Sequence, residues 1–175
     1  MSLLETLARE HGLFEEWFNK LEASLRYVDE ERALFRVRSI LAGLLPALDR
    51  HEEIEHLIFH FPAYTAQRGV ERLLSRVSLQ HGQILVLKQE VKKLLTDDQS
   101  RSLVQLQAAV FLLIMKLRSH FETEEGQLWP HYRRFESRSL GQSLDRRTQE
   151  RVRALEHEFW SHWLAFTATT DGVGA

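Results

Sequence analysis

The sequence predicts an all-α protein: an up-down-up-down four-helix bundle with an additional C-terminal helix. Only eight glycines and three prolines occur in 175 residues, so few positions force a helix to end. Between these positions, apolar residues recur at intervals of three and four, which is the spacing of one face of an α-helix. Four such segments with short connections favour antiparallel neighbours in one bundle.

The first predicted helix spans about residues 3–27; the second follows a charged turn at residues 29–31 and ends at Phe61-Pro62. Pro46 lies inside the second helix and is expected to bend it or to interrupt one turn. The interior face of the first helix is predicted to carry Leu4, Leu7, His11, Phe14, Phe18, Leu21 and Leu25. That of the second is predicted to carry Leu34, Val37, Leu41, Leu44, Leu48, His51, Glu55 and Ile58.

The third predicted helix spans about residues 68–95, and the fourth starts at a turn over residues 96–98. Lys88 fits the interior face of the third helix poorly. The other residues expected on that face are Val70, Leu74, Val77, His81, Ile84, Val91 and Leu95. The fourth helix is expected to continue past residue 131, with an interior face of Leu103, Leu106, Val110, Leu113, Leu117, His120, Glu124, Gln127 and His131.

After a loop around Gly141, a fifth amphipathic helix is predicted over about residues 144–168. Its apolar face is rich in aromatic residues, namely Phe159, Trp160, Trp163 and Phe166. Such a face must cover either the bundle or a second subunit. We favour the bundle and keep a homodimer through this helix as the alternative. The expected organisation is a single domain, with the bundle in residues 1–136 and the loop and fifth helix, residues 137–175, packed on it.

Composition and charge exclude several classes of function. The formal net charge is −2, so there is no basic footprint for nucleic acid. The absence of cysteine excludes disulfides, thiolate metal sites and a cysteine nucleophile. The first residues do not form a signal peptide, and no stretch approaches the ~20 apolar residues of a membrane span. We therefore expect a cytoplasmic protein without membrane contact.

Six ionisable side chains occupy interior positions where the spacing calls for leucine. They are His11, His51, Glu55, His81, His120 and Glu124. Burial of ionisable groups among apolar neighbours is unfavourable unless something binds them, so six in one core predict a metal cluster. In two helices a histidine and a glutamate lie four residues apart, on one helix face. Each pair can bind one metal, or its carboxylate can bridge to a second.

Helix direction places these six residues at a similar height in the bundle. In alternating antiparallel helices the four histidines fall within roughly 9 Å of one another along the axis, at a rise of ~1.5 Å per residue. Four imidazoles and two carboxylates without thiolates suit iron, manganese or zinc. Two six-coordinate irons need about 12 bonds, and the six residues supply about eight when both carboxylates bridge. An oxo or hydroxo bridge, solvent and an exogenous ligand must supply the rest, and Glu52 is a candidate seventh ligand.

The local sequences around the four histidines are REHGLFEEW at His11, DRHEEIEHLIFHFP at His51, LQHGQI at His81 and SHFETEEGQLWPHY at His120. Their order and spacing resemble the hemerythrin-like (HHE cation-binding) domains over roughly residues 3–135. The resemblance implies a bundle that holds two iron ions, bridged by Glu55 and Glu124, with the four histidines as terminal ligands.

One position departs from the oxygen-carrying members of this family, which have a second histidine four residues from the one in the third helix. The corresponding positions here hold Val77 and Leu85. The departure implies an open iron site, or one completed by Glu52 in an arrangement similar to the hemerythrin-like domain of an iron-sensing F-box protein. It disfavours simple reversible carriage of oxygen.

The expected function is therefore binding or sensing of dioxygen, nitric oxide or peroxide at an open iron site, with zinc or manganese as substitute metals. One alternative is a di-iron enzyme that detoxifies peroxide or nitric oxide or repairs iron–sulfur clusters. Another is an iron-dependent protein-interaction module. The remaining histidines are expected to be surface, packing or core residues outside the metal cluster: His56, His60, His131, His157 and His162.

Overall fold

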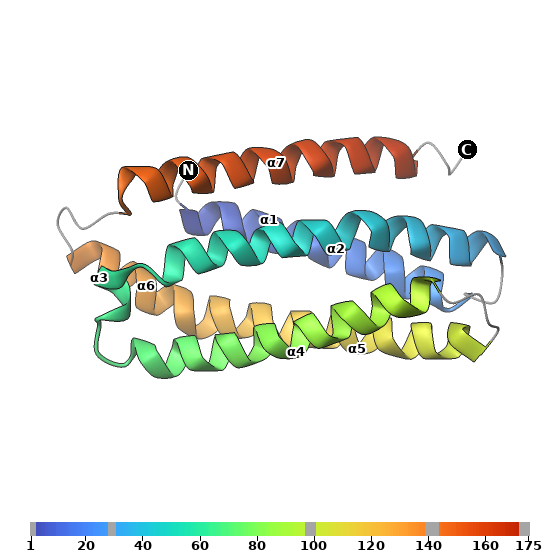
Figure 1. Ribbon diagram of the computed structural model, residues 1–175, viewed down its shortest axis with the longest axis horizontal. Coiled ribbons are helices and arrows are strands. Elements are labelled where there is room, and N and C mark those ends of the chain that lie inside the picture. The colour runs from blue at the N-terminus through green and yellow to red at the C-terminus, as the bar shows by residue number, and fades with distance from the viewer. Residues whose placement is uncertain (1–2, 28–30, 97–100, 139–143, 172–175) are drawn as a thin grey trace.

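The structure, a computed structural model, describes residues 3–27, 31–96, 101–138 and 144–171. Within these residues the fold is all-α and contains no strand. The long bundle helices are α1 (Leu3–Leu25), α2 (Glu31–Phe59), α4 (Val70–Thr96) and α5 (Arg101–Thr123). They run in alternating directions along the chain, so the predicted up-down-up-down bundle is confirmed (Figure 1).

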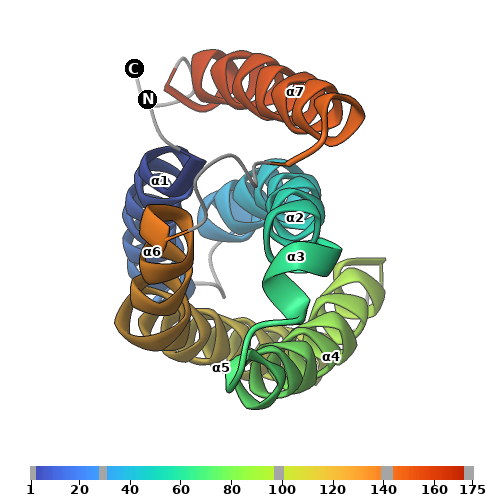
Figure 2. The same ribbon diagram turned by 90° about the vertical axis from the view of Figure 1, so that its left-hand side faces the viewer.

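The other elements lie at the ends and on the outside of the bundle. They are the single turn α3 (Pro62–Thr65), the π-helical segment η1 (Glu124–Leu128), α6 (Trp129–Arg138) and α7 (Arg146–Asp171). Seen from the end, α7 forms one layer, α1 and α2 form the next, and α4 and α5 form the third (Figure 2). The bundle therefore has α7 on one side only.

The expected helix boundaries and the observed ones differ mainly in detail. α2 continues through Pro46 without the interruption that the sequence allowed for, and α3, which begins at Pro62, was not expected. Proline suits this first position of a helix because its missing N–H has no partner there. Most residues of the predicted turns at 29–31 and 96–98 and of the loop at 137–143 lie outside the described residues.

The π-helical segment corrects the prediction of an unbroken fourth helix. Because a π-turn closes i→i+5 hydrogen bonds, it contains one residue more per turn than an α-helix and shifts the interior face along the sequence. The residues that continue the interior face are Leu128 and Tyr132, both buried. Gln127 is exposed and His131 is only half-buried, so placing these two on the interior face was wrong.

The aromatic face of α7 packs on α1 and α2. Phe159 and Trp163 are buried, and the Trp163 ring meets the Trp17 ring of α1 edge-on at a centroid distance of 5.7 Å. At Gly43 of α2 an added Cβ atom would lie 2.4 Å from the Phe166 ring, so only glycine permits this close approach of α7. The aromatic residues of α7 thus pack against the bundle of the same chain.

Two apolar clusters fill the bundle, one on each side of a polar layer. One contains the α1 and α2 residues from Phe14 to Leu48 together with Ile84 to Phe121 of α4 and α5. The other contains Leu4, Leu7, Ile54 and residues nearer the α3 end of the bundle. Each bundle helix, with η1 counted as part of α5, has one of the expected metal-binding residues in the sequence gap between these clusters, namely His11, His51, His81 and Glu124, and Glu55 and His120 lie next to these gaps. The fold therefore places them in one layer.

Candidate metal centre

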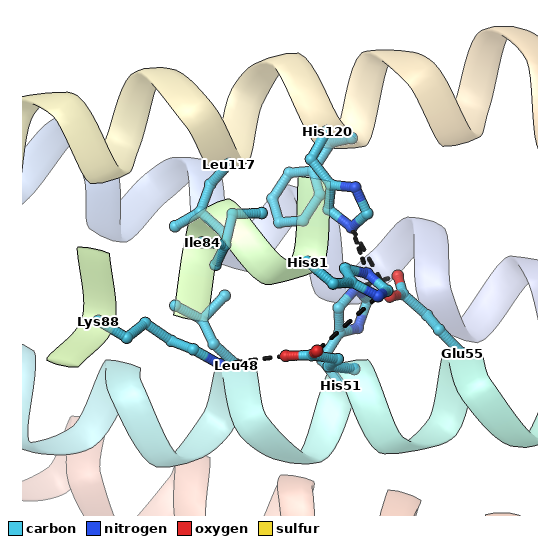
Figure 3. A pocket seen from close by; sticks show the side chains of 10 residues that line it. Leu48, His51, Glu55, His81, Ile84, Lys88, Leu117 and His120 are labelled. Carbon is cyan, nitrogen blue, oxygen red and sulfur yellow. Dashed lines mark hydrogen bonds and ion pairs between the residues drawn. The ribbon is translucent and has the colours of Figure 1, made fainter. Parts of the chain in front are cut away.

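The structure brings the six predicted residues together in this layer. The Nε2 atoms of His11 and His51 are 3.0 Å apart, and those of His81 and His120 are also 3.0 Å apart. Glu55 lies between the two histidine pairs: its Oε1 is 2.8 Å from Nε2 of His51, and its Oε2 is 3.3 Å from Nε2 of His81. Figure 3 shows His81 and His120 pointing toward each other beside Glu55.

The donor atoms form two groups that share both glutamates. One group is His11, His51, Glu55 and Glu124, and the other is Glu55, His81, His120 and Glu124. Within each group, one donor atom per residue lies within 4.8 Å of the others. Two neighbouring groups with two common carboxylates have the arrangement needed for a pair of bridged metal ions.

A comparison with known protein families matches residues 2–132 to the hemerythrin HHE cation-binding domain. The chain belongs to this family. Searches of curated proteins and of solved structures gave no match. The hemerythrin match covers the bundle, η1 and the start of α6, and it leaves α7 outside. Family membership and the observed cluster together support a bound metal cofactor.

The residues present fit such a cofactor. All four carboxylate oxygens of Glu55 and Glu124 are buried and accept no hydrogen bond of good geometry, although Glu55 forms a 2.8 Å ion pair with His51. Buried carboxylates that lack partners are strongly unfavourable, and a cation is the partner that two of them side by side require. The donor set, imidazole nitrogens and carboxylate oxygens, is one that binds iron, manganese or zinc.

The Nδ1 atoms of His11 and His51, which face away from the cluster, also have carboxylate partners. These partners were not predicted from the sequence. Nδ1 of His51 lies 2.6 Å from Glu10, and Nδ1 of His11 lies 2.8 Å from Glu125. A carboxylate on Nδ1 fixes the ring so that Nε2 faces the metal, as is usual for metal-binding histidines. Glu10 directly precedes His11 and Glu125 directly follows Glu124, but a sequence gives no sign of which histidine a distant glutamate reaches.

Two aromatic rings hold His11 in place. The Phe121 ring stacks on it at a centroid distance of 3.9 Å, and the Trp129 ring stacks at 5.0 Å. Trp129 is the first residue of α6, immediately after the π-helical segment, so the shift that this segment introduces brings Trp129 onto the interior. Packing and the Glu125 hydrogen bond thus fix the orientation of His11 before any metal binds.

In the metal-free cluster, the pKa values of the two shared glutamates shift in opposite directions. Burial tends to raise the pKa of Glu55, but the charge of His51 and the close approach of neighbouring histidine rings hold this pKa well below its usual value. Burial and the charge of Glu55 raise the pKa of Glu124 well above its usual value. Burial lowers the pKa of His51, yet Glu55 and Glu10 outweigh it and raise this pKa to about 10. Metal binding must therefore displace protons from the cluster.

Glu52 lies at the edge of the site and belongs to neither donor group. Its Oε1 is 3.8 Å from Nδ1 of His81, and its Oε2 accepts a hydrogen bond from Lys88 at 3.1 Å. The sequence prediction that Glu52 is a seventh ligand thus stays a prediction.

The other histidines lie away from the two donor groups. His56 and His60 stack on each other at a centroid distance of 4.4 Å, and Nδ1 of His131 lies 3.2 Å from the hydroxyl of Tyr64. His162 of α7 contacts the carbonyl oxygen of Gly43, and His157 is exposed. Among the described residues, no helix has the length and apolarity needed to cross a membrane.

Replacing Glu10 with glutamine tests the importance of the Nδ1 partners. We expect Glu10→Gln to lower metal affinity by about 10–100-fold, because the neutral amide leaves His51 less basic and less firmly oriented. Competition with a chelator of known affinity measures this change. Glu16→Gln, at an exposed position of the same helix, is the control. Equal affinities for the two variants would show that Glu10 has no such role.

Proposed function

We propose that the protein binds two iron ions between its four bundle helices and binds dioxygen, nitric oxide or peroxide at a coordination position left open. The observation that carries this proposal is the pair of donor groups that share the buried carboxylates of Glu55 and Glu124. In this proposal Glu55 and Glu124 bridge the ions, and the histidines are terminal ligands. Iron bound there supplies Lewis acidity and one-electron chemistry toward the small ligand.

The surroundings of His81 support an open position on its side of the cluster. Val77 is buried in the apolar cluster near α3, and Leu85 is 48% exposed, so neither position offers a further donor. A small pocket lies here, lined by apolar Leu48, Ile84, Leu117 and Phe121, by Glu52 and Lys88, and by His51, Glu55, His81 and His120 (Figure 3). It has room for about one water-sized molecule, which suits ligands of one or two heavy atoms.

Metal analysis tests the di-iron proposal. After anaerobic loading with ferrous iron and removal of the excess, we expect two iron ions per chain, one for each donor group. His120→Ala should lower this number, whereas His131→Ala, which alters a histidine outside both groups, should not. Less than one transition metal per chain in the unmodified protein would refute the proposal.

Peroxide distinguishes a binding protein from the alternative, a di-iron enzyme. A binding or sensing protein should give a spectral change that is stoichiometric with the metal centre, and an enzyme should consume peroxide over many turnovers. The presence of Glu52 and Lys88 in the small pocket, where a proton donor would be needed, keeps the enzyme as second candidate. The cytoplasmic location and the homodimer remain predictions.

A further inference from the structure

Lys88 is a buried lysine on the interior face of α4, where the sequence pattern calls for an apolar residue. It lies seven residues after His81 and four after Ile84, so all three share a helix face. Its side chain is 2% exposed and extends along the small pocket toward the carboxylates of α2 (Figure 3). A buried ammonium is very unfavourable unless it is paired, so the position must offer carboxylate partners.

Two carboxylates of α2 bind this ammonium. Lys88 Nζ donates to Oδ1 of Asp49 at 2.6 Å and to Oε2 of Glu52 at 3.1 Å. Asp49 is 48% exposed and also pairs with Lys92 at 3.6 Å, so it lies on the solvent side of Lys88. Glu52, which is shared with the small pocket, lies on the cluster side.

The second oxygen of Glu52 shows where Lys88 holds this carboxylate. Oε1 faces Nδ1 of His81 at 3.8 Å, whereas Nε2 of His81 faces Glu55. Glu52 thus approaches the outer nitrogen of its histidine, as Glu10 does for His51. To become a metal ligand, Glu52 would have to move toward the cluster and leave the buried ammonium with Asp49 alone.

We propose that Lys88 is a positioning residue that holds Glu52 at the outer nitrogen of His81 and away from the metal. It thereby keeps one coordination position beside the small pocket open for a ligand of one or two heavy atoms. This inference rests on the proposed function, because it assumes a metal bound by His81 and His120. The positioning role explains why a lysine occupies an interior position where the sequence pattern calls for an apolar residue.

Lys88→Met tests the inference, because methionine fills a similar volume without charge. Once released, Glu52 should ligate the metal and close the open position. We expect slower loss of iron to a chelator and about tenfold weaker binding of cyanide to the oxidised protein, since cyanide must compete with Glu52. Binding of nitric oxide to the reduced protein should weaken as well, because a closed position excludes neutral and anionic ligands alike.

The double variant Lys88→Met/Glu52→Gln separates this role from a merely structural or electrostatic one. It should restore cyanide binding to within about threefold of the unmodified protein, because glutamine is a poor ligand and no longer closes the position. Lys92→Met, on the next turn of α4, controls for the loss of a positive charge. An ammonium that only attracts anions would give weak cyanide binding in both Lys88 variants and unchanged nitric oxide binding, and this result would overturn the proposal.

Glu52→Gln alone provides a test that does not depend on the folding of a Lys88 variant. Because Glu52 is held off the metal in the unmodified protein, this variant should bind cyanide within about threefold of the unmodified protein. About tenfold tighter cyanide binding would show that Glu52 occupies the coordination position in the unmodified protein, and this result would refute the role of Lys88. Failure of the proposed function is distinguishable, since it would appear as a lack of iron in the unmodified protein.

Discussion

Glu124→Gln is expected to abolish binding of the metal pair and to stabilise the metal-free protein. Glu124 belongs to both donor groups, so under the di-iron proposal its loss would remove a ligand from each ion. In the metal-free protein the same carboxylate is fully buried, and neither oxygen has a hydrogen-bond partner. Glutamine has a similar shape and no charge, so it removes the unfavourable burial of a carboxylate beside Glu55.

The size of this stabilisation should depend on pH. Burial and the charge of Glu55 raise the pKa of Glu124 well above its usual value of 4.5. The favourable contribution of the protonated group is therefore complete below pH 4.5 and is lost as the pH rises through the raised pKa. Chelator-treated Glu124→Gln should match the unmodified protein near pH 4.5 and exceed it at pH 8 by about 1–3 kcal/mol in free energy of unfolding.

Urea unfolding at several pH values measures this difference, and metal analysis of the same samples measures the loss of iron. With iron present the order of stability should reverse, because only the unmodified protein gains the free energy of metal binding. Glu122→Gln, at an exposed position two residues before, is the control and should change neither quantity. A Glu124→Gln protein that retained two irons per chain would exclude Glu124 as a bridge.

The predicted residues converge because their positions follow from local rules. The spacing of three and four fixes which side chains face the interior, and the alternation of helix direction fixes their height. Both rules act within one helix or between neighbours, so the sequence alone suffices to assign His11, His51, His81 and His120 to one layer. The same rules placed Phe159 and Trp163 on the buried face of the last helix.

The rules fail where an interaction depends on a single turn or on distant residues. The π-turn at Glu124–Leu128 shifts the interior face by one residue, so the helical spacing wrongly placed Gln127 and His131 inside. Lys88 looked like a misfit because its partners lie on another helix, 36 and 39 residues earlier in the chain. The hydrogen bond from His51 to Glu10 spans 41 residues and has no local signal.

Phe159→Ala is expected to lower the free energy of unfolding of the whole protein by about 3–5 kcal/mol, as removal of a fully buried phenylalanine does. Phe159 is inaccessible to solvent and packs edge-on against Phe14 of α1 at a centroid distance of 5.8 Å. Phe14 in turn contacts the ring of His51 at 5.2 Å. The aromatic contacts of α7 thus extend from the outer layer to the metal-binding layer, although α7 lies outside the family match.

These contacts imply that α7 and the bundle unfold together as one domain. Thermal unfolding followed by helical circular dichroism and by tryptophan fluorescence should give one midpoint, which Phe159→Ala lowers by about 6–20 °C. His157→Ala, at an exposed position of the same helix, should change the stability by no more than about 0.5 kcal/mol. If Phe159→Ala instead lowered only the fluorescence midpoint, α7 would be a separate unit, and the bundle would hold the metal-binding residues in place without it. A common midpoint would show that α7 unfolds together with the bundle. The aromatic contacts of α7 would then help to hold His51 in position.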